Sequence, residues 1–229
     1  YASMFADYEF PKAPNVWDTL EGKPEYQKYW AGEGRKADRD AVKLKAPGFF
    51  GCNSFADSEL GRVIDCVRSQ APDAIIIYTS DHGEGLGSHC LYCKGPVMYN
   101  EIARVPLMIA GPGVPEGVVD HHPVSHINLP AMIMEYMGLP IPKLFEGKSL
   151  LEEVYHPEVR TNDYVVTEFT RYEIDHDGFG GLQMMRAIYD GRYKLAVHLL
   201  DITDEFYDKD TDPYEMKNLI WDEAYDAEK

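Results

Sequence analysis

Long apolar runs are missing from this sequence of 229 residues. No window approaches the roughly 18 consecutive apolar residues of a membrane-spanning helix. Residues 1–7 are also too polar for a signal peptide. We therefore expect a soluble chain without a membrane span. Because the first residue is Tyr1 rather than methionine, we expect a processed or truncated end, with which a targeting segment could have been lost. Localisation stays open between the cytoplasm and export.

Cysteine is scarce, and its four positions do not form a disulfide framework: Cys52, Cys66, Cys90 and Cys93. The last two make a lone CxxC pair. A zinc site would need a second ligand pair at similar spacing, and a thioredoxin-type motif would open a helix after a strand. Neither context is visible, so we expect reduced thiols packed beside a site.

Basic side chains are heavily outnumbered, because 22 Lys and Arg face 39 Asp and Glu and leave a net charge of −17. Binding to nucleic acid relies on clustered Lys and Arg that displace counterions. We therefore expect no nucleic-acid partner. An anionic substrate would need a locally positive site, which a metal ion with one or two basic side chains could supply.

The first two thirds of the sequence show an α/β pattern. Residues 1–48 are rich in Pro, Gly and charge and read as irregular. Four regular elements follow: a helix over 53–68 capped by Asn53 or Ser54, strands over 74–79 and 105–110, and a helix over 129–137. The continuous β-branched run at 74–79 is typical of a strand covered on both sides. This order predicts a mainly parallel sheet flanked by helices.

The last part of the sequence has a different pattern. Short strands without long helices between them are expected at 164–168, 185–189, 193–198 and 205–208. Asp190-Gly191 is a hairpin signal between two of them. We predict two domains, an α/β part over 1–155 and a small C-terminal subdomain over 156–229 with an antiparallel sheet and a final helix.

Asp81 and His82 follow the most hydrophobic strand directly. Ligands of open α/β sheets gather beyond the carboxyl ends of the strands. A carboxylate oxygen and a neutral imidazole nitrogen could both reach one divalent ion there, and Gly83 would relieve the turn. On the dipeptide alone, a capping Asp and a His that donates to a carbonyl are the favoured interpretation of the pattern.

The longer string is more specific. It reads Thr79-Ser-Asp-His-Gly-Glu-Gly-Leu-Gly-Ser-His-Cys-Leu-Tyr-Cys-Lys-Gly and continues to Arg104-Val-Pro-Leu. This string resembles the type I, formylglycine-dependent sulfatases of the alkaline phosphatase superfamily, in which a Ser-Asp-His/Asn-Gly turn, a Leu-Gly-x-His and a Lys precede the next strand. The resemblance extends from Gly48 through Ser125-His-Ile-Asn and Phe145-Glu-Gly-Lys-Ser to the final residues.

The resemblance implies an alkaline phosphatase/sulfatase-like fold and hydrolysis of a sulfate ester. Asp81 and His82 would be ligands of one divalent metal ion, with Ca²⁺ expected and Mg²⁺ or Mn²⁺ as alternatives. Lys94 would bind a sulfate oxygen and stabilise charge on the leaving oxygen. His89 either lines the pocket as a proton donor or only holds the loop. His176 would reach the pocket from the C-terminal subdomain and bind substrate.

Three further histidines lie close together in the sequence: His121, His122 and His126. They have no carboxylate partner at ligand spacing. We therefore interpret them as loop and helix-start residues.

The nucleophile of the family is absent. No Cys or Ser has Pro at plus two and Arg at plus four, the motif whose Cys or Ser is oxidised to formylglycine. Since two ligands cannot satisfy the roughly six to eight oxygens that calcium prefers, we expect this chain alone to be inactive and to bind metal weakly. Formylglycine and two acidic ligands are expected upstream, supplied by the missing N-terminal part or by another chain of the same protein.

Two other functions stay open at this stage. A phosphonate monoester hydrolase or phosphodiesterase of the same superfamily shares the Asp-His turn and the Lys spacing. A non-catalytic module could have kept the fold and lost the nucleophile. The substrate, a sulfate-ester small molecule or a sulfated carbohydrate, is not given by the sequence.

Overall fold

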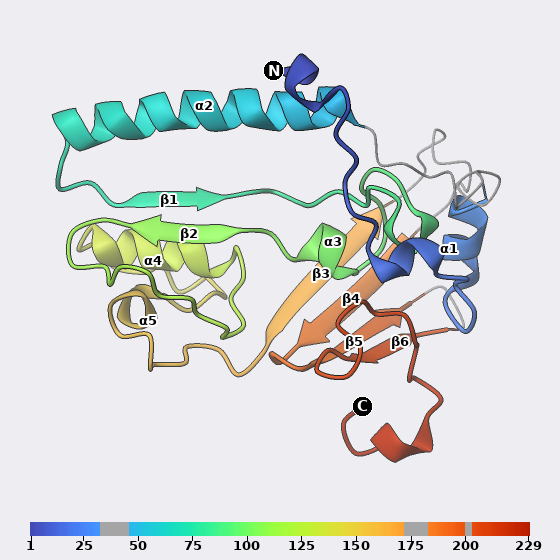
Figure 1. Cartoon of the computed structure of the whole chain (residues 1–229). Helices are drawn as coiled ribbons and strands as arrows, with labels where there is room; N and C mark the ends of the chain where they lie inside the picture. The colour runs from blue at the N-terminus through green and yellow to red at the C-terminus, as the bar shows by residue number, and fades with distance from the viewer. Residues whose placement is uncertain (33–45, 172–182, 200–202) are drawn as a thin grey trace.

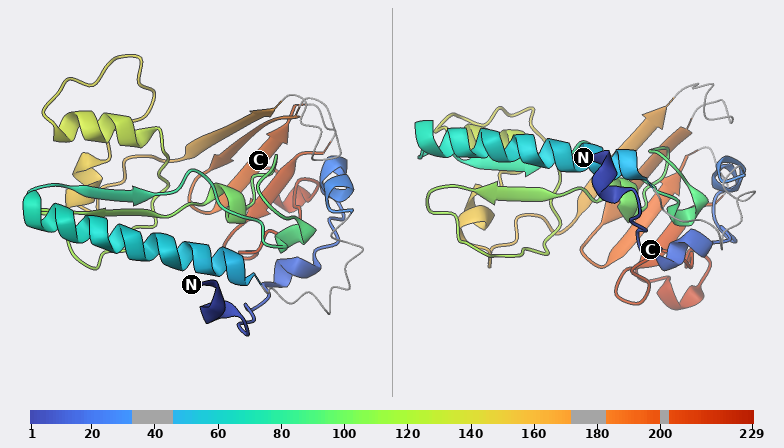
Figure 2. Two further views of the ribbon diagram at one scale, coloured as in Figure 1. Left: turned by 90° about the horizontal axis from the view of Figure 1, so that it is seen from above. Right: turned by 45° about the horizontal axis from the view of Figure 1, so that its top comes forward.

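A computed structural model describes residues 1–32, 46–171, 183–199 and 203–229. The long helix α2 (Pro47–Gln70) lies on one side of a strand pair, β1 (Ile76–Thr79) and β2 (Leu107–Ala110), and α4 (Asn128–Tyr136) lies on the other side (Figures 1 and 2). Short helices α1 (Glu25–Trp30), α3 (Asn100–Ala103) and α5 (Leu151–Tyr155) sit in the connections. None of the described helices is long and apolar enough to cross a membrane.

The predicted mainly parallel sheet is wrong for the described part of the chain. β1 pairs with β2 in antiparallel register, with Ile76 opposite Ala110 and Thr79 opposite Leu107. A parallel pair needs a crossover that returns the chain to the same end of the sheet. The connection over 80–106 is instead a loop with a 3-10 turn at Ser88–Cys90 and the short α3, so the chain turns back and β2 runs against β1 (Figure 1).

The predicted C-terminal antiparallel sheet is confirmed. It has the order β3 (Val165–Arg171), β4 (Gln183–Tyr189), β5 (Tyr193–His198), β6 (Glu205–Asp208). Asp190-Gly191 turns the chain between β4 and β5, where Gly191 adopts a positive φ of 107°. The sheet lies at the end of the molecule away from α4 and α5 (Figure 2).

Two predicted helix details are wrong. α2 begins at Pro47 rather than near Asn53, because proline suits the first turn of a helix, where its missing N–H costs nothing. The expected final helix is only a 3-10 turn at Glu223–Tyr225. So short a segment needs tertiary packing to become an α-helix, and the preceding Trp221 is 74% exposed.

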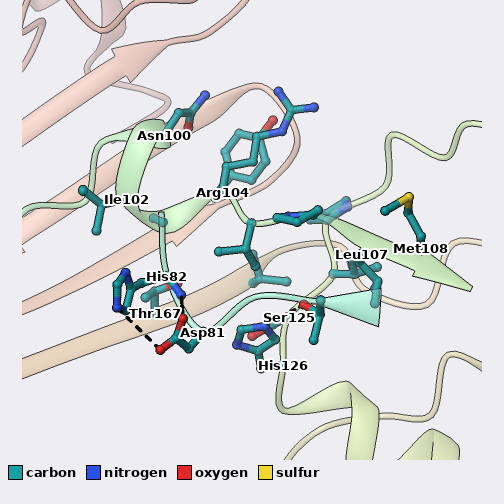
Figure 3. A pocket seen from close by; sticks show the side chains of 18 of the residues that line it. Asp81, His82, Asn100, Ile102, Arg104, Leu107, Met108, Ser125, His126 and Thr167 are labelled. Carbon is teal, nitrogen blue, oxygen red and sulfur yellow. Dashed lines mark hydrogen bonds and ion pairs between the residues drawn. The ribbon is translucent and has the colours of Figure 1, made fainter. Parts of the chain in front are cut away.

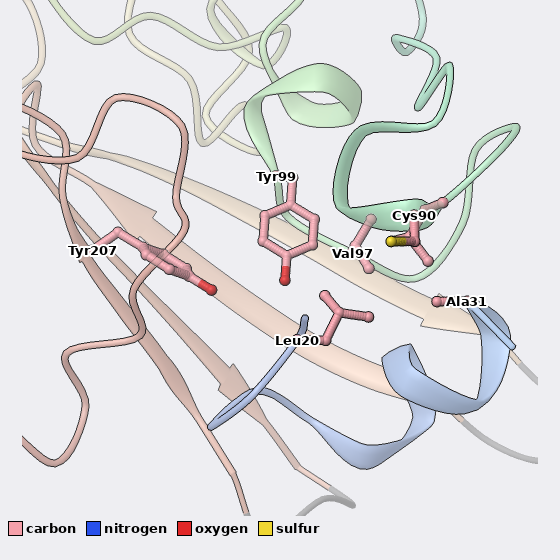
Figure 4. Packing of buried hydrophobic residues seen from close by; sticks show 7 residues of the cluster. Leu20, Ala31, Cys90, Val97, Tyr99 and Tyr207 are labelled. Carbon is pink, nitrogen blue, oxygen red and sulfur yellow. The ribbon is translucent and has the colours of Figure 1, made fainter. Parts of the chain in front are cut away.

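The main hydrophobic cluster joins three distant parts of the chain. Tyr99 in the loop after β1 packs with Leu20 near the N-terminus and with Tyr207 on β6 (Figure 4). The other members are Ala31, Cys90, Leu91 and Val97. The cluster therefore anchors the 80–106 loop to the C-terminal sheet.

A buried carboxylate lies under this cluster. Glu205 accepts hydrogen bonds at Oε1 from the hydroxyls of Tyr207 (2.7 Å) and Tyr99 (3.1 Å). At Oε2 it accepts from Gln27 Nε2 (2.9 Å) and pairs with His198 Nε2 (2.8 Å). Burial alone would raise the pKa of Glu205, but the bond and charge of His198 together with the Tyr207 bond lower it overall.

We expect Glu205→Ala to lower the free energy of unfolding by about 3–5 kcal/mol, because it removes the partner that four buried polar groups share, of which the Tyr99 hydroxyl keeps another acceptor, Gln27 Oε1. The matched control is Glu168→Ala, since the Glu168–Arg186 pair is well exposed and should contribute under about 1 kcal/mol. Since the folded-state pKa of Glu205 is lowered, its ionic stabilisation is present above the ordinary carboxyl pKa and lost as pH falls through the depressed value. Denaturant unfolding of Glu205→Ala and Glu168→Ala checks the expected difference in stability. Equal losses of unfolding free energy in the two variants would contradict the expectation.

Candidate functional site

Asp81 and His82 lie on the segment that leaves the carboxyl end of β1 and face a wide open cavity (Figure 3). The cavity is also lined by residues of the 94–106 loop, by β2 and by β3. Directly after the pair, the Gly83 N–H donates to the carbonyl of Ile102 (2.9 Å). The two ends of the 80–106 loop are thereby held together beside the cavity.

Gly83 is required by a close backbone approach. A Cβ at this position would lie 1.8 Å from the carbonyl oxygen of Glu101 and 2.8 Å from its carbonyl carbon. Backbone atoms cannot yield as the end of a side chain can. The absence of a side chain at Gly83 thus sets the position of the neighbouring His82.

We expect Gly83→Ala to lower the free energy of unfolding by about 1–3 kcal/mol, because the added Cβ would have to displace the backbone of Glu101. Gly61→Ala is the control, because nothing lies within 4 Å of the Cβ that it would add to α2. Denaturant unfolding of both variants checks the expectation. A Gly83→Ala protein as stable as the Gly61→Ala control would show that the close approach is unimportant.

The Asp81 carboxylate is preorganised as an anion. Its Oδ1 accepts a hydrogen bond from the backbone N–H of His82 (2.9 Å), and this bond lowers the pKa of Asp81 below its ordinary value. The second oxygen, Oδ2, lies 3.5 Å from His82 Nε2. At neutral pH the side chain therefore offers a charged oxygen next to an imidazole.

The His82 ring is oriented by its own turn. Its Nδ1 lies 2.8 Å from the carbonyl oxygen of Gly83, which is an acceptor only, so Nδ1 carries the proton and donates. The other nitrogen, Nε2, then carries a lone pair. Lys94 Nζ donates to this Nε2 at 2.7 Å.

Lys94 is brought to His82 by a tightly folded loop. The N–H of Gly85 donates to the carbonyl of Cys93 (3.0 Å), and the N–H of Gly87 donates to that of Leu91 (2.8 Å). The Lys94 side chain is exposed to the same cavity. Three residues that sequence reasoning assigned to one site, Asp81, His82 and Lys94, are thus brought together.

His89 lies elsewhere, in the protein interior. It is 1% exposed, its Nδ1 is 2.6 Å from Asp18 Oδ2, and its ring stacks on Tyr99 with centroids 3.7 Å apart. It does not line the cavity of Asp81 and Lys94. A catalytic role for His89 stays a prediction, and its contacts favour the alternative of a residue that holds the loop.

Two other predictions concern His176 and the cysteines. His176 lies outside the described residues. Cys90 is buried, and its Sγ donates to the carbonyl of Asp18 (3.3 Å), while Cys93 is exposed. All four cysteines are free thiols, and no cysteine is part of a ligand cluster in the described chain.

The Asp81–His82 pair has the donor chemistry of a divalent metal site. A charged oxygen and an imidazole lone pair lie close together beside the cavity, as shared ligands of an ion would. An ion bound there would replace Lys94 Nζ as the partner of His82 Nε2. Within the described ranges, no third His, Cys, Asp or Glu joins them at ligand distance. The pair therefore fits a metal ion as part of a coordination shell and does not form a complete one.

Sequence reasoning missed several residues that line the same cavity. Asn100, Arg104 and Thr167 come from α3, its end and β3 (Figure 3). His126 Nε2 lies 3.1 Å from Thr79 Oγ1, at the end of β1. His126 and Thr167 are far from the Asp81 motif in the sequence, so no local spacing signals their presence, whereas Asn100 and Arg104 lie within the string that runs from Thr79 to Arg104-Val-Pro-Leu.

Two family models match this chain. The model described as Sulfatase matches residues 18–139. The model described as N-sulphoglucosamine sulphohydrolase, C-terminal, matches residues 87–228. Together they extend over both the cavity and the C-terminal sheet.

Comparisons with individual proteins also find sulfatases and related hydrolases. "Uncharacterized sulfatase YidJ" of Escherichia coli (strain K12) is 38% identical over 223 residues, which are 97% of this chain and 43% of that protein. The phosphonate monoester hydrolase of Silicibacter pomeroyi is similar in structure, with a TM-score of 0.64 and 28% identity over 75% of this chain and 36% of that one. The chain thus spans less than half the length of either relative.

A third comparison extends the likeness of the fold to the whole chain. The solved structure of BT4656 in complex with its substrate D-glucosamine-2-N,6-O-disulfate has a TM-score of 0.83 at 19% identity, over 99% of this chain and 58% of that one. At this identity the likeness supports the arrangement of helices and strands alone.

Proposed function

The chain belongs to the sulfatase family of the alkaline phosphatase superfamily, and from this premise we propose that it is the C-terminal part of a sulfuric ester hydrolase. The observation that carries the proposal is the convergence of Asp81, His82 and Lys94 on one side of the open cavity. Asp81 and His82 are proposed as two ligands of one divalent ion, for which calcium is expected. Bound there, such an ion would polarise a sulfate oxygen as a Lewis acid.

The residues of this chain would act on the substrate as follows. The Asp81 carboxylate is ionised at neutral pH, and the bond from the His82 N–H lowers its pKa further. The Gly83 carbonyl oxygen accepts from Nδ1 of the His82 ring and so holds Nε2 next to Lys94. Lys94 is at hydrogen-bond distance from this ring. Its ammonium would bind a sulfate oxygen and offset the negative charge that builds on the leaving oxygen.

The remainder of the active site is proposed to lie in another part of the protein. The 229 residues lack the Cys/Ser-x-Pro-x-Arg motif, so the formylglycine nucleophile would come from outside them. The surface of α2 supports this, because Gly51 is its only buried residue while Phe55 and Val63 are 51% and 58% exposed. Apolar side chains exposed along one helix mark a surface that further polypeptide would cover.

We also propose that the chain is divided into parts of two domains. Residues 1–155 would be the C-terminal portion of the catalytic α/β domain, and 156–229 would form the subdomain with the antiparallel sheet. As substrate we propose a sulfated carbohydrate. The match of residues 87–228 to a family model named after N-sulphoglucosamine, a sulfated sugar, supports this class.

The test is hydrolysis by the full-length protein of an aryl sulfate and of a matched aryl phosphonate monoester, each at saturating Ca²⁺. We expect the higher kcat/KM for the sulfate ester, and no turnover by residues 1–229 alone. The likeness to the Silicibacter pomeroyi enzyme favours phosphonate monoester hydrolysis as the second candidate. A higher kcat/KM for the phosphonate would support that candidate. Inactivity on both of these and on a sulfated glucosamine would favour a non-catalytic module.

A further inference from the structure

A second group of metal-ligand side chains lies outside the Asp81–His82 pair. Asp120 and His122 belong to the loop between β2 and α4, and Glu153 lies on α5. Each offers one ligand atom, and these atoms lie within 4.8 Å of one another. His122 is a loop residue, as interpreted from the sequence, but the expectation that it has no carboxylate partner is wrong, because Asp120 and the sequence-distant Glu153 both lie beside it.

The distances are those of ligands around one small ion. His122 Nδ1 lies 3.1 Å from Asp120 Oδ1 and 3.3 Å from Glu153 Oε1. Tetrahedral ligands about 2.0–2.1 Å from a zinc ion are separated from one another by about 3.3–3.4 Å. The distance from His122 Nδ1 to the oxygen of each carboxylate is therefore close to the distance between two ligands that share one zinc ion.

Two buried atoms point to a ligand that would satisfy them. Glu153 is only 3% exposed, yet its Oε1 accepts no hydrogen bond from the described residues, and His122 Nδ1 takes part in none either. A proton on Nδ1 is thus not aligned with either oxygen, although both are close. A buried carboxylate oxygen without a hydrogen bond lowers the stability of the fold unless a cation is bound to it.

The surrounding bonds hold these side chains in place. Glu153 Oε2 accepts from the Thr161 N–H (2.9 Å), which leaves Oε1 directed at His122. Asp120 Oδ1 accepts from the backbone N–H of His122 (2.8 Å). Asn162 Nδ2 donates to the carbonyl of Pro123 (3.1 Å), which fixes the loop next to Thr161. Ligands held in this way are preorganised for an ion.

We propose that Asp120, His122 and Glu153 bind a divalent transition-metal ion of the zinc class. One imidazole and two carboxylates suit Zn²⁺ better than Ca²⁺, which prefers oxygen ligands alone. The side chains of Asp120 and His122 are 33% and 29% exposed, so water can complete the shell. The ion would tie the loop before α4 to α5. It shares no ligand with the proposed catalytic ion and does not depend on sulfatase activity.

The test uses the full-length protein in an Asp81→Asn background, so that the proposed catalytic ion contributes less. The protein is stripped with a chelator and titrated with ZnCl₂ by calorimetry, and thermal unfolding is recorded with and without Zn²⁺. We expect saturable binding that Glu153→Gln weakens by at least about 100-fold, with loss of the Zn²⁺-dependent rise in melting temperature. His121→Gln, at the exposed neighbouring histidine, should keep both.

Glu153→Gln is chosen because its amide oxygen can still accept from Thr161, so the fold of α5 should be retained. Circular dichroism of the stripped variants verifies this. Equal Zn²⁺ affinity with and without Glu153→Gln would overturn the proposal, as would the absence of saturable binding in the parent. In either case the cluster would be only a structural contact between His122 and two carboxylates.

Discussion

Replacing Lys94 with alanine in the full-length protein is expected to lower kcat for a sulfate ester by about 100- to 1,000-fold, the loss seen when one donor to a developing negative charge is removed. The ammonium lies 2.7 Å from His82 Nε2 and is exposed to the cavity. Because the charge it would stabilise is larger in the transition state than in the bound ester, kcat should fall more than KM rises.

The control for this variant is Lys143→Ala. Lys143 is exposed and does not line the cavity, so its loss should leave the kinetics unchanged. Steady-state kinetics on the aryl sulfate would compare both variants with the parent. If Lys94→Ala retained the parent kcat, Lys94 would be a solvated surface residue and its proposed role would be wrong.

Asp81→Asn is expected to weaken binding of the proposed catalytic metal ion and to lower kcat/KM by at least about 100-fold, since the charged ligand becomes neutral while its shape is kept. A part of the activity should return at high Ca²⁺ concentration, because the other ligands remain. The measurement is metal content by mass spectrometry together with kcat/KM as a function of added Ca²⁺.

Asp73→Asn is the matched control, because Asp73 is an exposed residue in the turn before β1 and does not line the cavity. It should leave the metal content and the kinetics unchanged. An Asp81→Asn protein with the metal content and activity of the parent would show that Asp81 is a capping residue, the alternative that the dipeptide alone left open.

The parts of the fold that sequence predicted are those decided by local patterns. The β-branched run before Thr79 predicted β1, and Asp190-Gly191 predicted the turn between β4 and β5. The direction of β2 relative to β1 was not predictable in this way. It depends on the path of the chain over 80–106, which is set by contacts such as that of Gly83 with Ile102.

In the candidate site, too, the sequence predicted what a local motif decides and did not predict what contacts between distant residues decide. Asp81, His82 and Lys94 stand in one motif, so the sequence placed them together, and the structure brings them within hydrogen-bond and ion-pair distances. The environment of His89 is decided by Asp18, which is 71 positions earlier. Partners this far apart in the sequence leave no periodic signal.

The central claim is that Asp81, His82 and Lys94 bind the metal ion and the sulfate group of one active site. A crystal structure of the full-length protein with Ca²⁺ and a sulfate ester tests it directly. We predict an Asp81 carboxylate oxygen and His82 Nε2 within about 2.6 Å of the ion, and Lys94 Nζ within about 3 Å of a sulfate oxygen. An ion that Asp81 and His82 do not coordinate, or a sulfate group out of reach of Lys94, would contradict the account.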